Sequence, residues 1–134
     1  MTSKITYTQN LRTEATHLDS GISIITDAPK DNQGLGQAFS PTDLLATSLG
    51  SCMLTIMGLN ARTNEMNIDG TEAEITKIMA AYPRRVVEIV VKIKFPDRKY
   101  SNQEMKMLEI AALNCPVAKS LHPDIKQNVS FIWT

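Results

Sequence analysis

The chain has 134 residues, of which 43% are hydrophobic, and this length and composition suit a single folded domain over residues 1–134. Basic and acidic residues number 14 each, so the net charge is zero and no long-range field favours nucleic acid as a partner. No export signal precedes the first predicted strand, and we expect no stretch to reach the roughly 18 apolar residues that span a bilayer. These features predict a cytoplasmic protein without a membrane partner.

The first third of the chain predicts a meander of three short strands, over residues 4–8, 12–17 and 22–26. Polar turn residues separate these alternating segments, as is typical of hairpins. Residues 28–39 hold two glycines and one proline without any period, which predicts a surface loop.

A long helix is predicted from Pro41 to about residue 63. The Ser40 hydroxyl can cap it, and proline is well tolerated at a first helical position. Its apolar residues fall on one stripe of a helix, formed by Leu45, Leu49, Cys52, Met53 and Ile56. The opposite face also has few charges, so we expect this helix to be central and covered nearly all round.

The second half predicts a hairpin of strands over residues 71–80 and 85–95. Alternation in the second strand predicts that the following side chains share one face: Val87, Ile89, Val91, Ile93 and Phe95. Ser101 and Glu104 form a capping box for a helix over residues 102–113. A short helix to Leu121 and a strand over residues 129–133 follow. The fold class predicted is therefore α+β, with a mainly antiparallel sheet packed on the long central helix.

Two cysteines carry the most reactive chemistry in the sequence. Cys52 lies in the middle of the long helix, where it is either a small buried hydrophobe or a thiol that a nearby cation activates. Cys115 precedes Pro116 at a helix start, where it is either a simple cap or a thiolate that free N–H groups stabilise. Cytosolic thiols are kept reduced, so any pairing of the two is expected to be transient.

The segments SPTDLLATSLGSC, residues 40–52, and LNCPVAKSL, residues 113–121, resemble the two cysteine motifs of the OsmC/Ohr family of osmotically inducible and organic-hydroperoxide-resistance proteins. Residues 75–89 are similar to the strand pair of its OsmC-like branch. This resemblance implies an OsmC-like fold in which two chains form an intertwined homodimer around their long helices. A second subunit would also cover an apolar helix that one small chain cannot enclose.

The resemblance further implies a thiol-dependent reduction of organic hydroperoxides. Cys52 would attack the peroxide and become a sulfenic acid, Cys115 would resolve it as a disulfide, and a dithiol or small-thiol reductant would restore both thiols. No cofactor and no metal are expected, and His17 and His122 do not stand at metal-ligand spacing with the cysteines. The alternative is a family member with little or no peroxidase activity that binds a small molecule or senses thiol oxidation.

Peroxidase members of the family activate the thiol with an arginine held by a glutamate. Arg12 is the best match for that arginine, and the alternative is an ordinary solvated arginine on a strand. The glutamate position falls on Thr42, and the next residue, Asp43, is the acid that this branch places there. Asp43 and Cys52 would lie about 13 Å apart along the helix and on opposite faces, so Asp43 could act only through an arginine or across the dimer. A plain acidic residue in a first helical turn is the alternative. Glu14, on the same strand face as Arg12, is a further candidate partner.

Overall fold

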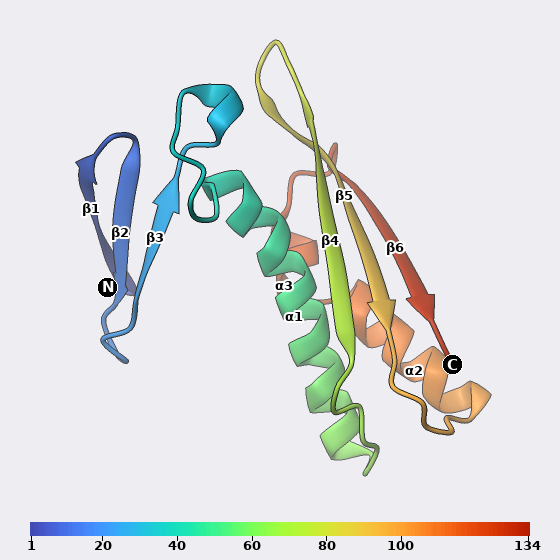
Figure 1. The fold of residues 1–134 in the computed structure, drawn as a ribbon. Helices are drawn as coiled ribbons and strands as arrows, with labels where there is room; N and C mark the ends of the chain where they lie inside the picture. The colour runs from blue at the N-terminus through green and yellow to red at the C-terminus, as the bar shows by residue number, and fades with distance from the viewer. The chain divides into compact units, whose positions relative to one another are not determined.

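The computed structural model describes residues 1–134 and contains two compact units, residues 1–45 and residues 46–134. Strands and helices follow one another in the order expected from the sequence, three strands, a long helix, two strands, two helices and a last strand (Figure 1). The α+β fold class is thereby confirmed. The expectation that residues 1–134 form one domain stays a prediction.

The first unit is an antiparallel meander of β1 (Ser3–Gln9), β2 (Arg12–His17) and β3 (Ser23–Asp27). Its register aligns Ile5 with Ala15 and Ala15 with Ile24, so these apolar side chains form a row on one face. That row is uncovered: Ile5 is 64% exposed, Ile24 is 48% exposed, and Tyr7 on the same face is 63% exposed. The 28–39 loop contains only a short 3-10 turn, η1 (Lys30–Asn32).

Helix α1 (Pro41–Thr63) begins at the serine predicted to cap it. The Asp43 N–H donates to Ser40 Oγ at 3.0 Å, and the Ser40 N–H donates to Asp43 Oδ2 at 2.9 Å. This reciprocal pair is a capping box in which aspartate takes the place of glutamate, and it satisfies two amides that the first helical turn leaves without partners. The local sequence thus fixes where α1 starts.

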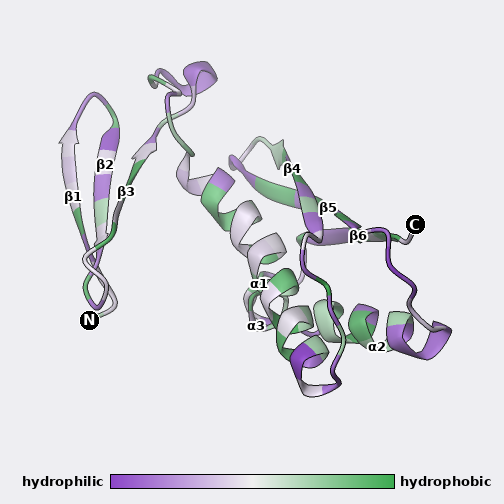
Figure 2. Ribbon diagram, turned by 60° about the horizontal axis from the view of Figure 1, so that its bottom comes forward, coloured by the Kyte–Doolittle hydropathy of each residue, from purple (hydrophilic) through white to green (hydrophobic).

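The second unit is a three-stranded sheet, in the order β4 (Glu72–Ala80), β5 (Arg85–Lys94) and β6 (Lys126–Ile132). β4 and β5 are antiparallel, whereas β6 runs parallel to β5. The crossover between β5 and β6 consists of α2 (Asn102–Leu113) and α3 (Pro116–Ser120). Figure 2 shows α1, α2 and α3 gathered on one side of this sheet. The predicted capping box at Ser101 and Glu104 is confirmed at the start of α2.

The core of the second unit lies between α1 and β5, with Leu108 and Ala112 of α2 joining it. α1 turns the following residues toward the core: Ala46, Leu49, Gly50, Met53, Met57 and Ala61. The predicted stripe is therefore wrong at Leu45, which is 39% exposed, and Cys52 is only half-buried. Small residues lie on the buried side because the helix approaches β4 closely, and a Cβ on Gly50 would overlap the Ile75 side chain.

The prediction for the inner face of β5 is wrong at one position. Val86 is buried, whereas Val87, which the alternation had placed inward, is only half-buried. The register of β4 with β5 shifts between Ile78 and Met79, which pair with Glu88 and Val86, so Val87 is left without an opposite residue. An extra residue of this kind reverses the alternation of a strand, and a bulge is difficult to infer from one strand alone.

A cluster of three aromatic residues lies beyond the C-terminal ends of the parallel strands β5 and β6. Phe95 is 2% exposed and stacks on Trp133 with ring centroids 3.6 Å apart and planes 10° apart. Tyr100 contacts both rings edge-on, at 6.0 Å from Phe95 and 5.4 Å from Trp133. These contacts link the end of β5, the segment before α2 and the residue after β6.

The expectation that no segment is long and apolar enough to cross a bilayer is wrong for α1, whose 23 residues meet both criteria. Length and composition alone are a weak indication, since core helices of soluble proteins also meet them. In this structure α1 contributes six buried residues to the core.

Candidate active site

The structure brings Cys52 and Cys115 together within the second unit. Cys52 lies midway along α1, and Cys115 is the N-cap residue of α3, far away in the sequence. The Cys52 thiol lies near enough to raise the pKa of Cys115, and both are free thiols rather than a disulfide. The two neighbouring sulfurs thus come from different elements, one from α1 and one from the crossover between β5 and β6.

The two sulfurs differ in exposure. Cys115 has no exposed surface, whereas Cys52 is half-buried. Burial raises the pKa of the Cys115 thiol, and the neighbouring Cys52 raises it further, while the backbone amides of Ala118 and Val117 oppose these effects. Cys115 therefore keeps its proton more firmly than an ordinary cysteine, and Cys52 is the thiol that a molecule from solvent can reach.

Hydrogen bonds fix both the Cys115 sulfur and the short helix α3 that follows it. Its Sγ accepts a hydrogen bond from the Ala118 N–H at 3.4 Å, which fixes the sulfur at the start of α3. The carbonyl of Ala118 accepts a hydrogen bond from the Gln127 side chain of β6 at 2.9 Å. The last strand thereby anchors the short helix that carries the sulfur.

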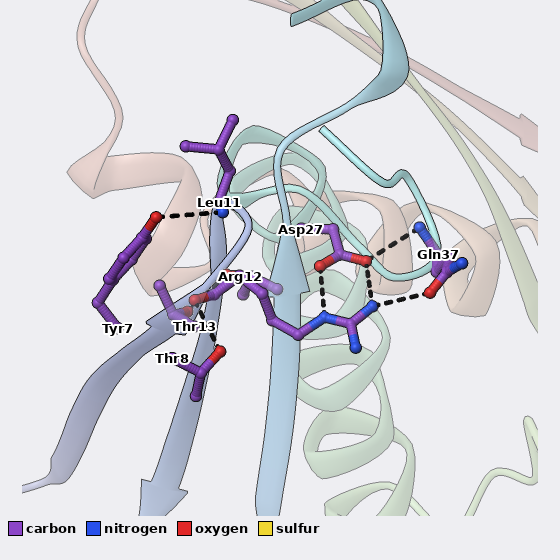
Figure 3. A network of polar contacts seen from close by, with 8 residues as sticks. Tyr7, Thr8, Leu11, Arg12, Thr13, Asp27 and Gln37 are labelled. Atoms are coloured by element: carbon purple, nitrogen blue, oxygen red, sulfur yellow. Dashed lines mark hydrogen bonds and ion pairs between the residues drawn. The ribbon is translucent and has the colours of Figure 1, made fainter. Parts of the chain in front are cut away.

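Arg12, the predicted cation, lies in the first unit and forms a two-point ion pair with Asp27. Arg12 Nε donates to Asp27 Oδ1 at 2.7 Å, and Nη2 donates to Oδ2 at 2.9 Å (Figure 3). The Asp27 side chain has no exposed surface, and the Arg12 side chain is 28% exposed. The hydrogen bond from Arg12 is the largest cause that lowers the pKa of Asp27, and burial acts in the opposite direction. Asp27 therefore stays ionised beside the guanidinium at neutral pH.

The carboxylate that holds Arg12 is thus neither of those suggested by the sequence. Asp43 accepts a hydrogen bond from the Ser40 amide in the capping box, and Glu14 is exposed on β2. A part for Asp43 in the site stays a prediction. In the sequence, Asp27 is recognisable only as a charged residue at the end of a strand. That it pairs with Arg12 follows from the strand register, which sets the two residues opposite each other.

The described residues contain no group of three or more His, Cys, Asp or Glu side chains arranged to hold a metal ion. The chemistry that the second unit offers is that of a neighbouring pair of thiols, of which one is accessible and one is enclosed. Such a pair can form a disulfide when the accessible sulfur is oxidised.

Comparison with known proteins gives a family match over most of the chain. Residues 34–130 match the family described as OsmC-like protein, and these residues include both cysteines. No curated protein matches the chain.

Solved structures resemble the chain over nearly its whole length. A protein of Psychrobacter arcticus 273-4, described as an osmotic stress induced and detoxification response protein, is 59% identical, with a TM-score of 0.94 over 98% of this chain and 95% of that one. The organic hydroperoxide resistance protein OsmC of Legionella pneumophila is 14% identical, with a TM-score of 0.77 over 98% and 97%. The organic hydroperoxide resistance protein OhrB of Bacillus subtilis is 18% identical, with a TM-score of 0.68 over 98% of each chain.

Proposed function

Because the chain belongs to the OsmC-like protein family, we propose that it reduces organic hydroperoxides in the cytoplasm by a two-cysteine mechanism. The observation that carries the proposal is the proximity of the half-buried Cys52 to the buried Cys115, remote in sequence, which shows in the effect of Cys52 on the pKa of Cys115. The names of the two hydroperoxide resistance proteins that share the fold support the choice of substrate class.

In the first step, the Cys52 thiolate attacks the terminal oxygen of the hydroperoxide. A sulfur–oxygen bond forms, the O–O bond breaks, and the alkoxide leaves and takes up a proton to become the alcohol. Cys52 is thereby oxidised to a sulfenic acid. The exposure of Cys52 and the enclosure of Cys115 support this assignment, because the attacking thiol has to meet the substrate.

In the second step, Cys115 attacks the Cys52 sulfur. A disulfide forms, the sulfur–oxygen bond breaks, and the leaving hydroxide takes the Cys115 proton to become water. The raised pKa keeps Cys115 protonated and therefore a weaker nucleophile than an ionised thiol, which leaves the attack on the peroxide to Cys52. A dithiol or small-thiol reductant then reduces the disulfide by exchange and is itself oxidised, so no metal or organic cofactor takes part.

The cation for the Cys52 thiolate is assigned to Arg12, because an arginine fixed by a buried carboxylate is a pre-oriented positive charge. A nearby positive charge lowers a thiol pKa and raises the thiolate fraction at neutral pH.

The test of this function is a single-turnover oxidation. Reduced protein mixed with cumene hydroperoxide is expected to lose two hydrogens promptly, by intact mass, through a disulfide between Cys52 and Cys115. Peptide mapping identifies the linked residues, and a reductant-free sample without peroxide is the control. Slow oxidation, or oxidation without that disulfide, contradicts the mechanism and favours a binding or thiol-sensing protein.

The protein acts as a homodimer in this proposal. The apolar row of the β1–β2–β3 sheet and Leu59 on α1, which is 53% exposed, are surfaces that a second copy would cover. Light scattering is expected to give about twice the 14.8 kDa of one chain.

Ile5→Lys is expected to weaken the dimer by roughly tenfold or more, because a lysine in a buried contact loses its hydration. Thr6→Lys, on the opposite face of the same strand, is the matched control and should leave the dimer intact. A monomeric wild-type protein, or equal behaviour of the two variants, contradicts the dimer.

A further inference from the structure

A groove between α1 and α2 takes no part in the thiol chemistry proposed above. Its volume is about 390 Å³, which lies within the range of small-molecule sites. One residue of α1 and five residues of α2 line it: Asn60, Gln103, Lys106, Met107, Ile110 and Ala111. The five positions on α2 are three or one residues apart, so they form a single stripe along that helix. All six residues belong to the second unit, so the groove lies within one compact body.

The apolar part of the groove is formed by α2. Ile110 is 53% exposed, while Met107 and Ala111 are half-buried. A methionine side chain is unbranched and polarizable, so it adapts to the shape of a bound molecule. These three side chains therefore offer a contact surface to an apolar group of moderate size.

Lys106 gives the same groove a positive charge. The two acidic residues of α2 are engaged elsewhere. Glu104 accepts a hydrogen bond from the Ser101 N–H in the capping box at 2.9 Å, and Glu109 accepts one from the Trp133 indole at 3.5 Å. The ammonium group of Lys106 is therefore left for a negative group that enters the groove from solvent.

Asn60 brings an unsatisfied hydrogen-bond acceptor to the α1 side of the groove. Its side-chain oxygen Oδ1 is buried and has no hydrogen-bond partner. A buried acceptor without a donor costs free energy, and native proteins contain few of them. The terminal torsion of an asparagine side chain is soft, so the amide can turn its oxygen toward the groove that Asn60 lines. A molecule that supplies a donor there removes a cost that the empty groove carries.

We infer that this groove is a binding site for a small apolar carboxylate that also carries a hydroxyl or an amide N–H. The carboxylate pairs with Lys106, the apolar body lies on Met107 and Ile110, and the donor group pairs with the side-chain oxygen of Asn60. Neither cysteine lines the groove, so the site goes beyond the proposed peroxide chemistry and does not depend on it.

The experiment is a titration of the full chain with 3-phenyllactate, followed by amide chemical shifts in nuclear magnetic resonance spectra. We expect a dissociation constant on the order of 0.1–1 mM, which suits a ligand of this size in an open groove. The shifts should be largest at the residues that line the groove. 3-Phenylpropionate, which lacks only the hydroxyl, should bind roughly fivefold more weakly, because the Asn60 oxygen then finds no donor. 3-Phenyllactamide, which lacks the charge, should bind about two- to fivefold more weakly than 3-phenyllactate.

Two variants test the assigned contacts separately. In Asn60→Ala, 3-phenyllactate and 3-phenylpropionate should bind equally well, because the partner of the hydroxyl is gone. Alanine is favourable in a helix, so this variant should keep its fold. Lys106→Met should abolish the preference for 3-phenyllactate over its uncharged amide. Lys92→Met, which removes an exposed lysine from β5 instead, is the matched control and should leave all three affinities unchanged.

The results that overturn the inference are equally specific. An absence of shifts at the groove in several millimolar 3-phenyllactate would show that the site does not bind this class of molecule. A preference for the hydroxyl that persists in Asn60→Ala would remove Asn60 from the site. A second copy of the chain is the competing occupant. If no probe binds and Ile110→Lys converts a dimer into a monomer by light scattering, the groove is a contact between subunits.

Discussion

Replacing Cys52 with serine is expected to reduce hydroperoxide consumption by at least about 1000-fold, which corresponds to about 4 kcal/mol of transition-state stabilisation. A serine hydroxyl is not ionised at neutral pH, so the nucleophile is lost while the shape of the helix is kept. The measurement is the steady-state decay of cumene hydroperoxide in the presence of a dithiol reductant.

Cys115→Ser is the matched comparison for this variant. It keeps the attacking thiol, so one equivalent of alcohol should still form at close to the wild-type rate, and the protein should then accumulate as sulfenic or sulfinic acid at Cys52. Unchanged turnover in Cys52→Ser, or complete loss of the first alcohol equivalent in Cys115→Ser alone, would show that the roles of the two sulfurs are assigned wrongly.

Phe95→Ala is expected to be the most destabilising single substitution in the second unit. Phe95 is 2% exposed and contacts both Tyr100 and Trp133, so its removal leaves a cavity and ends the ring stacking. Large-to-small aromatic substitutions in cores cost about 3–5 kcal/mol, which should lower the melting temperature by roughly 10–20 °C. Trp133 is the only tryptophan, so its fluorescence reports the unfolding of this unit directly.

Phe95→Leu serves as the control for this prediction. It retains an apolar side chain of similar reach but no ring, and a substitution of this kind costs less than about 1.5 kcal/mol. If Phe95→Ala and Phe95→Leu have the same melting temperature, the volume of the side chain at this position does not determine the stability of the protein. A wild-type melting temperature for Phe95→Ala would mean that the aromatic cluster contributes little.

Sequence-local signals predicted the elements of this protein well. The helix starts at Ser40 and Ser101 depend on side chains within one turn of the amides that they cap, so a short window holds all the relevant information. Hydrophobic alternation likewise located β5, although not the bulge that buries Val86 in place of Val87. The bulge depends on the pairing with β4, which the sequence of β5 does not contain.

The candidate site was predicted only where a pattern or a resemblance pointed to it. Cys52 and Cys115 stood out by their motifs, but their contact requires the whole crossover to be folded. Asp27 was missed because its relation to Arg12 arises from the register of β2 and β3, and its relation to Gln37 from the path of an irregular loop. Side-chain networks of this kind are set by tertiary structure, so spacing along the chain does not reveal them.

The hydrogen bond between Gln127 and Ala118 makes the position of the Cys115 sulfur depend on the last strand, β6. Gln127 pairs with the buried Ile89 in the parallel register of β5 and β6. Its side chain donates a hydrogen bond to the carbonyl of Ala118, and the N–H of the same residue donates to the Cys115 sulfur. In the proposed mechanism, loss of the Gln127 side chain would therefore act on Cys115 through α3, without any contact to either sulfur. A Gln127→Ala variant is therefore expected to form the disulfide between Cys52 and Cys115 more slowly than the unchanged protein, although it keeps both thiols.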